Sequence, residues 1–165
     1  MNEFMNHTTR RSLVLGAAAT GAALAWPTAA RAQAKAPLVG PLAPNPAEFS
    51  KQMAAFTKGA TPLAEGLLLD VSMLADNPSA VPVKVKVTLP MSEQEWCEEI
   101  IVLADLNPSP LACRLQFTAA AGTAEAAVRV RLSQTQTIHA LARMKSGKIL
   151  AAKQAVTVAA SGCGM

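Results

Sequence analysis

The sequence contains no tyrosine, and aromatic residues make up only 4% of its 165 residues. Charged residues are also sparse, at 16%, and the formal net charge is +4. Single-stranded nucleic acid is usually bound by aromatic side chains that stack on bases, within a strongly basic surface. The composition therefore favours neither a nucleic acid nor an anionic membrane as a partner.

Motifs for catalysis or metal binding are equally scarce. After the N-terminal segment the only histidine is His139, which the strand pattern places on a polar face, where a lone histidine is usually a surface residue. No second histidine is available for a metal site, and there is neither a Cys-x-x-Cys motif nor a glycine-rich phosphate loop after a strand. The acidic residues Glu93, Glu95, Glu98 and Glu99 are interpreted as a solvated surface, with a docking patch as the alternative. We expect a protein that is not an enzyme and binds no cofactor or metal.

The first 34 residues have the features of a bacterial export signal. Arg10 and Arg11 precede an uncharged apolar run over residues 13–26, and small residues suitable for cleavage lie near positions 32–34. The run is too short to span a bilayer as a helix. The arginine pair favours the twin-arginine route, with an ordinary secretory signal as the alternative, and either route predicts a periplasmic protein.

Cleavage leaves roughly 130 residues, enough for one sizeable core. Three cysteines remain, an odd number in an oxidising compartment, so at least one is free or paired between chains. A hairpin centred near Pro108 would separate Cys97 and Cys113 by about 20 Å along the strands. A disulfide requires Cα atoms within about 7 Å, so we expect no bond between them. Cys113 is predicted to be a buried core thiol, and Cys97 an inert residue in a connection.

Residues 35–158 are predicted to form one mainly β domain with a short N-terminal helix. Asn45 is a helix N-cap candidate, Pro46 fits the first helical position, and Gly59 can end the helix. Alternation of apolar and polar residues then predicts about seven strands, with turns near 75–79, 107–110, 120–123 and 145–148. Short strands at this regular spacing are typical of an immunoglobulin-like antiparallel β-sandwich.

The C-terminal residues 159–165 are predicted to form a flexible carrier arm around Cys163. Ser161, Gly162 and Gly164 are small neighbours, and no charged side chain follows Lys153. From Val158 such an arm would reach about 17 Å when extended. A thin, uncharged arm can enter a narrow channel without the cost of desolvating a charge. Because a thiolate is the nucleophile of sulfur chemistry, these features indicate a covalent carrier that presents its load to partner enzymes.

Short blocks along the chain form an ordered set: Arg10-Arg11, Asp76-Asn77-Pro78-Ser79-Ala80-Val81-Pro82-Val83, Ala104-Asp105-Leu106-Asn107-Pro108, Leu132-Ser133-Gln134-Thr135-Gln136-Thr137, Ala151-Ala152-Lys153 and Gly162-Cys163-Gly164. In these blocks, which span the mature chain, the sequence resembles the SoxY family, the sulfur-carrier subunits of the periplasmic thiosulfate-oxidising Sox system.

The resemblance implies that Cys163 is the attachment site for sulfur and that Gly162 and Gly164 flank it in a movable arm. It implies a heterodimer with a second β-sandwich subunit, SoxZ. It also implies three enzyme partners: a c-type cytochrome complex that joins thiosulfate to the thiol, a hydrolase that releases sulfate, and a sulfane dehydrogenase.

The tip departs from the family's usual Gly-Gly-Cys-Gly-Gly pattern, because Ser161 and Met165 occupy the outer positions. The sequence therefore leaves open whether this chain is the main carrier or a paralogue with other partners. Two further hypotheses remain from the residues alone. One is a periplasmic immunoglobulin-like binding module in which Cys163 forms an intermolecular disulfide, and the other is a stand-alone thiol enzyme.

Overall fold

The computed structural model describes residues 38–159. Two features predicted from the sequence lie outside this range: the export signal over residues 1–34, and the tip with Ser161, Gly162, Cys163 and Gly164. The described residues form a 3-10 turn, one α-helix and eight strands, with a second 3-10 turn between β5 and β6. The elements are η1 (Gly40–Leu42), α1 (Pro46–Thr57), β1 (Leu67–Val71), β2 (Leu74–Ala75), β3 (Val81–Val87), β4 (Cys97–Ala104), β5 (Leu111–Gln116), η2 (Ala119–Ala121), β6 (Glu125–Val130), β7 (Gln136–Met144) and β8 (Ile149–Val158).

The predicted helix is confirmed, and local signals account for its limits. The Asn45 side chain accepts a hydrogen bond from the Glu48 N–H at 3.1 Å, and Pro46 occupies the first turn, where no backbone donor is needed. At the other end Lys58 adopts a left-handed conformation and donates to the Ala54 carbonyl. Gly59 follows with a φ of 84°, which glycine tolerates. The helix thus begins and ends where the sequence predicts.

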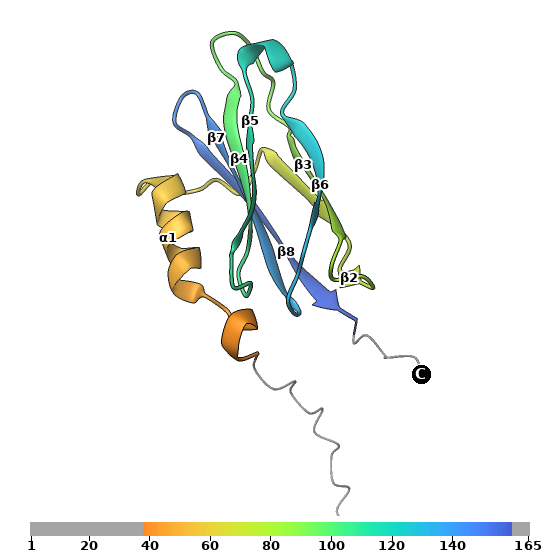
Figure 1. The fold of residues 1–165 in the computed structure, drawn as a ribbon. Helices are drawn as coiled ribbons and strands as arrows, with labels where there is room; N and C mark the ends of the chain where they lie inside the picture. The colour runs from red at the N-terminus through yellow and green to blue at the C-terminus, as the bar shows by residue number, and fades with distance from the viewer. Residues whose placement is uncertain (1–37, 160–165) are drawn as a thin grey trace, which may run out of the picture. The chain divides into compact units, whose positions relative to one another are not determined.

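The strands form two sheets that pack face to face, so the mainly β sandwich is confirmed (Figure 1). A three-stranded sheet has the order β1-β3-β6, and a five-stranded sheet has the order β2-β8-β7-β4-β5. All strand pairs are antiparallel except one, since the short strand β2 runs parallel to the end of β8. The sequence predicts a turn at Ala75, but the structure places it in β2. In the structure a hydrogen bond from the Ala159 N–H to the Ala75 carbonyl adds this segment to the sheet edge.

The main core lies between the two sheets. Strand β3 alternates strictly, with its valines buried and Lys84 and Lys86 on the outer face, as the sequence predicts. Strand β4 is buried on both faces because the five-stranded sheet is covered twice. Its second face packs against α1 through Phe56, which contacts a cluster containing Ile101, Leu103, Leu141 and Ile149. Helix α1 therefore forms a partial third layer, visible beside β4 and β7 in Figure 1.

Candidate functional site

The base of the predicted carrier arm is held on both edges of β8. On one edge the Thr157 N–H donates to the Met73 carbonyl at 2.7 Å, and the Ala159 N–H donates to the Ala75 carbonyl at 3.0 Å. On the other edge the Val158 N–H donates to the Thr135 side-chain oxygen at 3.0 Å. These bonds fix the backbone as far as Ala159. Any arm that carries Cys163 therefore starts from a defined point at the edge of the five-stranded sheet.

A polar network links the loops that flank this base. The Asn107 side-chain oxygen accepts hydrogen bonds from the Ser133 N–H at 3.0 Å and from the Gln136 amide at 2.8 Å, and its amide donates to the Arg131 carbonyl at 2.7 Å. Gln136 is buried, and its oxygen accepts from the Leu106 N–H. The loop after β4 is thereby fixed to the loop before β7. Because Thr135 belongs to the second loop, the network also positions the acceptor that binds Val158.

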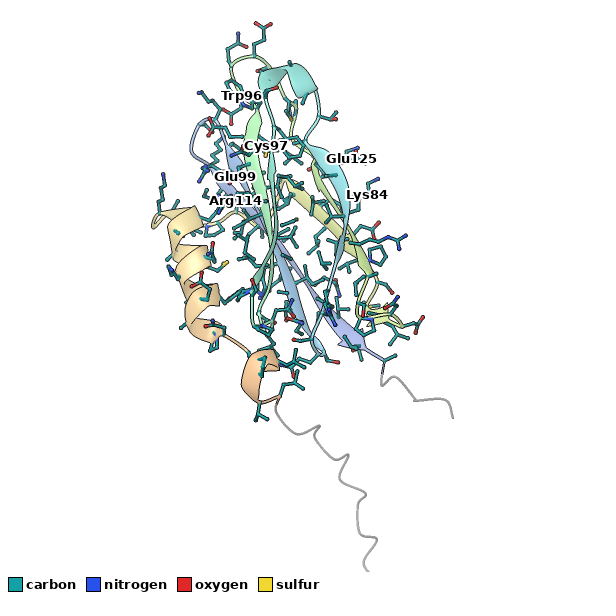
Figure 2. The ribbon with its side chains drawn as sticks, viewed as in Figure 1. Lys84, Trp96, Cys97, Glu99, Arg114 and Glu125 are labelled. Atoms are coloured by element: carbon teal, nitrogen blue, oxygen red, sulfur yellow. The ribbon has the colours of Figure 1, made fainter. Side chains whose placement is uncertain are left out.

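The two described cysteines are not paired with each other, as predicted. The Cys97 side chain is fully buried, and desolvation raises its pKa to about 11 (Figure 2). Its assignment to a connection was wrong, because Cys97 is the first residue of β4 and pairs with Met144. Cys113 is half-buried on the edge strand β5, not fully buried, and burial raises the pKa of its thiol as well. Both groups are therefore protonated at neutral pH and react slowly.

One member of the acidic run is not solvated. Glu99 is only 3% exposed, and its carboxylate pairs with Arg114 of β5 and Arg143 of β7. Figure 2 shows Glu99 beside Arg114 at the sheet. The interpretation of Glu99 as a surface residue is therefore wrong. Position 99 shares a strand face with Ile101 and Leu103, and this alternation was a signal that the side chain points under α1.

His139 is also less exposed than predicted. Its side chain is 21% exposed because the aromatic ring of Phe49 covers it at a centroid distance of 5.1 Å. Its Nε2 lies 3.7 Å from the Asp105 carboxylate. Desolvation lowers the pKa of His139, while Asp105 opposes that change and Lys153 adds to it. The strand alternation gave the face of His139 correctly, but it did not show that α1 packs on that face.

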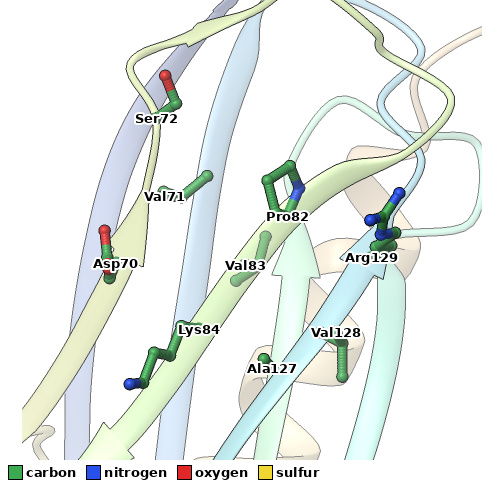
Figure 3. A pocket seen from close by; sticks show the side chains of 9 residues that line it. All are labelled: Asp70, Val71, Ser72, Pro82, Val83, Lys84, Ala127, Val128 and Arg129. Carbon is green, nitrogen blue, oxygen red and sulfur yellow. The ribbon is translucent and has the colours of Figure 1, made fainter.

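The outer face of the three-stranded sheet carries a hollow of about 390 Å³ (Figure 3). Asp70, Lys84 and Arg129 line it together with Pro82, Val83 and neighbouring residues of β1 and β6. Lys84 is already paired with Glu125 at 2.6 Å. The lining holds neither a thiol nor a histidine, so this hollow offers no sulfur nucleophile.

Within residues 38–159 no group of three or more histidine, cysteine or acidic side chains is arranged to hold a metal ion. Over the same residues no helix is long and apolar enough to cross a bilayer. The expectation that the protein needs no cofactor stays a prediction.

Comparison with known proteins gives one family match. Residues 53–163 match the family described as "Sulfur oxidation protein SoxY". The matched region covers most of the sandwich and ends at Cys163. A search of curated proteins found no significant match.

Comparison with solved structures gives matches of different strength. The sulfur carrier protein SoxY from Chlorobium limicola f thiosulfatophilum superposes with a TM-score of 0.55 at 21% sequence identity, over 69% of this chain and 98% of that one. A putative superoxide reductase from Thermotoga maritima gives a TM-score of 0.48 at 19% identity, over 62% of this chain and 89% of that one. A superoxide reductase from Ignicoccus hospitalis gives 0.47 at 12% identity, over 57% and 80%.

Proposed function

Because this chain belongs to the SoxY family of sulfur oxidation proteins, whose members are sulfur-carrier subunits, we propose that it carries sulfur intermediates covalently on Cys163. The family match ends at this residue, and that observation carries the proposal. The fixed base at Ala159 supports it further. Cys163 is four positions after Ala159, so an extended arm would reach about 14 Å beyond the sheet edge.

The other two cysteines support the same assignment by contrast. A carrier thiol must be accessible and must form a thiolate readily. Cys97 is fully buried, with a pKa raised to about 11, and the pKa of Cys113 is raised by burial. Both are poor competitors for an incoming sulfur compound at neutral pH. Sulfur chemistry would therefore concentrate on Cys163.

The proposed cycle begins with oxidation. The Cys163 thiolate and thiosulfate form one S–S bond, giving a cysteine S-thiosulfonate, and the two electrons released pass to a c-type cytochrome. Water then attacks the terminal sulfone, so that sulfate and two protons leave and a persulfide remains on Cys163. A sulfane dehydrogenase then oxidises the outer sulfur of that persulfide to a sulfonate, which takes up three oxygen atoms from water and passes six electrons to a c-type cytochrome. A second hydrolysis releases sulfate and restores the Cys163 thiol. In this scheme the sandwich performs no catalysis and serves as the carrier.

Family membership also supports the setting of this reaction. Proteins of the SoxY family are periplasmic, in agreement with the export signal predicted over residues 1–34. We propose that the chain forms a heterodimer with a SoxZ-like β-sandwich subunit and delivers its arm to the enzymes of the Sox system. Ser161 and Met165 at the tip would then determine which enzyme channels accept the arm.

The test is intact-protein mass spectrometry of the mature chain, purified without reductant from host cells growing on thiosulfate, followed by mapping of the C-terminal peptide. We expect a reducible sulfur adduct on Cys163 and none on Cys97 or Cys113. In the host, Cys163→Ser should abolish thiosulfate oxidation, whereas Cys113→Ser should leave it intact. A bare thiol, or a disulfide between two copies of Cys163, together with unimpaired oxidation in Cys163→Ser, would refute the carrier role.

A further inference from the structure

Two basic side chains lie directly opposite each other on the sheet face that α1 covers. His139 of β7 pairs in register with Lys153 of β8. The Ala151 and Ala159 N–H groups point away from β7, toward Leu63 and Ala75. The Lys153 N–H, two residues after Ala151, points the same way, so this pair is not hydrogen-bonded, and its Cα atoms lie about 4.5 Å apart. When His139 is protonated, the two like charges are destabilising unless a counter-charge is present.

The pair opens onto a hollow of about 460 Å³ between α1 and the sheet. Met53 of α1, Pro62 and Ala64 of the following segment, and Leu141 and Ala151 of the sheet form an apolar wall. His139 and Lys153 form the basic end. The hollow thus combines a positive end with a wall that suits a soft or apolar group.

The charges around His139 leave room for an anion on one side. Asp105 is the acidic group that faces the ring, and one of its oxygens already accepts a hydrogen bond from the Thr137 N–H at 2.9 Å. From α1 the facing side chains are Phe49 and Met53, which are uncharged. On the β8 side the facing group is Lys153. An anion at the basic end would therefore contact Lys153, and it would also contact a positively charged His139 once that ring is protonated.

We propose that this hollow binds a small dianion that has an oxyanion end and a soft or apolar end, of which thiosulfate is the simplest example. The oxyanion end lies between His139 and Lys153, and the soft end lies against Met53 and Ala151. No covalent bond forms or breaks in this step. The inference does not depend on Cys163, because every residue that carries it belongs to the sandwich and the helix.

Proton linkage gives the site a measurable signature. His139 is neutral at pH 7, since burial lowers its pKa below the ordinary value. A bound dianion favours the imidazolium form and raises the pKa of His139, by about one pH unit for a close charge. By reciprocity the dianion binds about tenfold more weakly once His139 has lost its proton.

The experiment is an NMR titration of the His139 ring against pH in residues 35–165 carrying Cys163→Ser, which removes the arm thiol. His139 is the only histidine in those residues. Spectra are recorded with sodium thiosulfate, with sodium sulfate, and with sodium chloride at equal ionic strength. We expect thiosulfate to raise the pKa of His139 by about one pH unit and sulfate to raise it less, relative to chloride.

Charge variants complete the test. Lys153→Gln should weaken thiosulfate binding about fivefold, and Lys153→Arg should retain it. Lys148→Gln, at an exposed lysine in the turn between β7 and β8, should have no effect. The site would be overturned if the pKa of His139 were the same in thiosulfate and in chloride. It would also be overturned if Lys153→Gln and Lys148→Gln bound thiosulfate equally well. An equal response to sulfate would overturn the role of the apolar wall. Each of these results leaves the adduct on Cys163 as a separate question.

Discussion

Replacing Glu99 with glutamine tests whether the buried carboxylate stabilises the sheet beneath α1. Glu99 is 3% exposed and accepts hydrogen bonds from Arg114 and Arg143. A hydrogen bond to a charged group contributes about 1.5–3 kcal/mol. The Arg114 side chain is 48% exposed, so solvent screening reduces its share, while Arg143 is 27% exposed and also lies over the Phe56 ring at 4.8 Å. We therefore expect Glu99→Gln to lower the free energy of unfolding by about 3 kcal/mol.

Urea denaturation of the mature chain measures this loss. An unchanged slope of the free energy of unfolding against urea concentration would show that the variant and the wild-type chain expose the same surface on unfolding. Glu93→Gln is the matched control, because Glu93 is exposed and belongs to the same acidic run. It should change the free energy of unfolding by less than about 0.5 kcal/mol. Double-mutant cycles should show stronger coupling of Glu99 to Arg143 than to Arg114. The reasoning is refuted by a Glu99→Gln variant as stable as the control, or by the opposite order of couplings.

Three further outcomes follow from the structure. Burial raises the pKa of Cys97 to about 11, so the folded protein keeps this thiol protonated at a pH where the unfolded chain loses the proton. The free energy of unfolding should therefore fall as pH rises from 9 to 11, by about 1.4 kcal/mol per pH unit. Urea denaturation across this range should show a smaller fall in Cys97→Ala. Gly66→Ala should lower the free energy of unfolding more than Gly147→Ala does. Both glycines have positive φ, but of the two only Gly66 would place an added Cβ 3.0–3.2 Å from neighbouring side chains. Equal melting temperatures of the two variants would contradict this. Asn45→Ala should lower the free energy of unfolding by about 1 kcal/mol through loss of the helix cap, which chemical denaturation measures.

Elements set by neighbouring residues could be predicted from the sequence. The helix begins at Pro46 because Asn45 accepts a hydrogen bond from Glu48, three positions later. Strand β3 shows its burial in its own alternation of valine and lysine. In both cases the relevant partners lie within one turn or one strand. The face of His139 followed from the same rule.

The proposed carrier thiol, Cys163, was also accessible to sequence reasoning, because the argument rests on its small, uncharged neighbours in the sequence. The sequence led to the family through ordered blocks, and the match over residues 53–163 confirms that family. The chemistry proposed for Cys163 stays a prediction, since the tip lies outside the described residues.

Other features needed partners that are distant in the chain. The buried Glu99 carboxylate is paired with Arg114 and Arg143, which reach it from the two neighbouring strands. These arginines lie 15 and 44 positions away in the sequence, so no local pattern shows the pairing. The register of β4 on β5 shifts between Val102 and Leu103, so that Leu103 pairs with Leu111 while the adjacent Val102 pairs with Cys113. One irregular residue is enough to change a cross-strand neighbour.

The sequence by itself determined most of the secondary structure, the family and the candidate thiol, because periodicity, caps and short motifs are local properties of the chain. Only the tertiary structure decided which polar groups are buried. Burial depends on the layer packed above a strand, and here that layer is α1, whose Phe49 and Phe56 cover His139 and the aliphatic groups of β4 and β7. Strand pairing places Lys153 opposite His139 beside a hollow, and hydrogen bonds to the Met73 and Ala75 carbonyls fix the end of β8 from which the proposed arm begins.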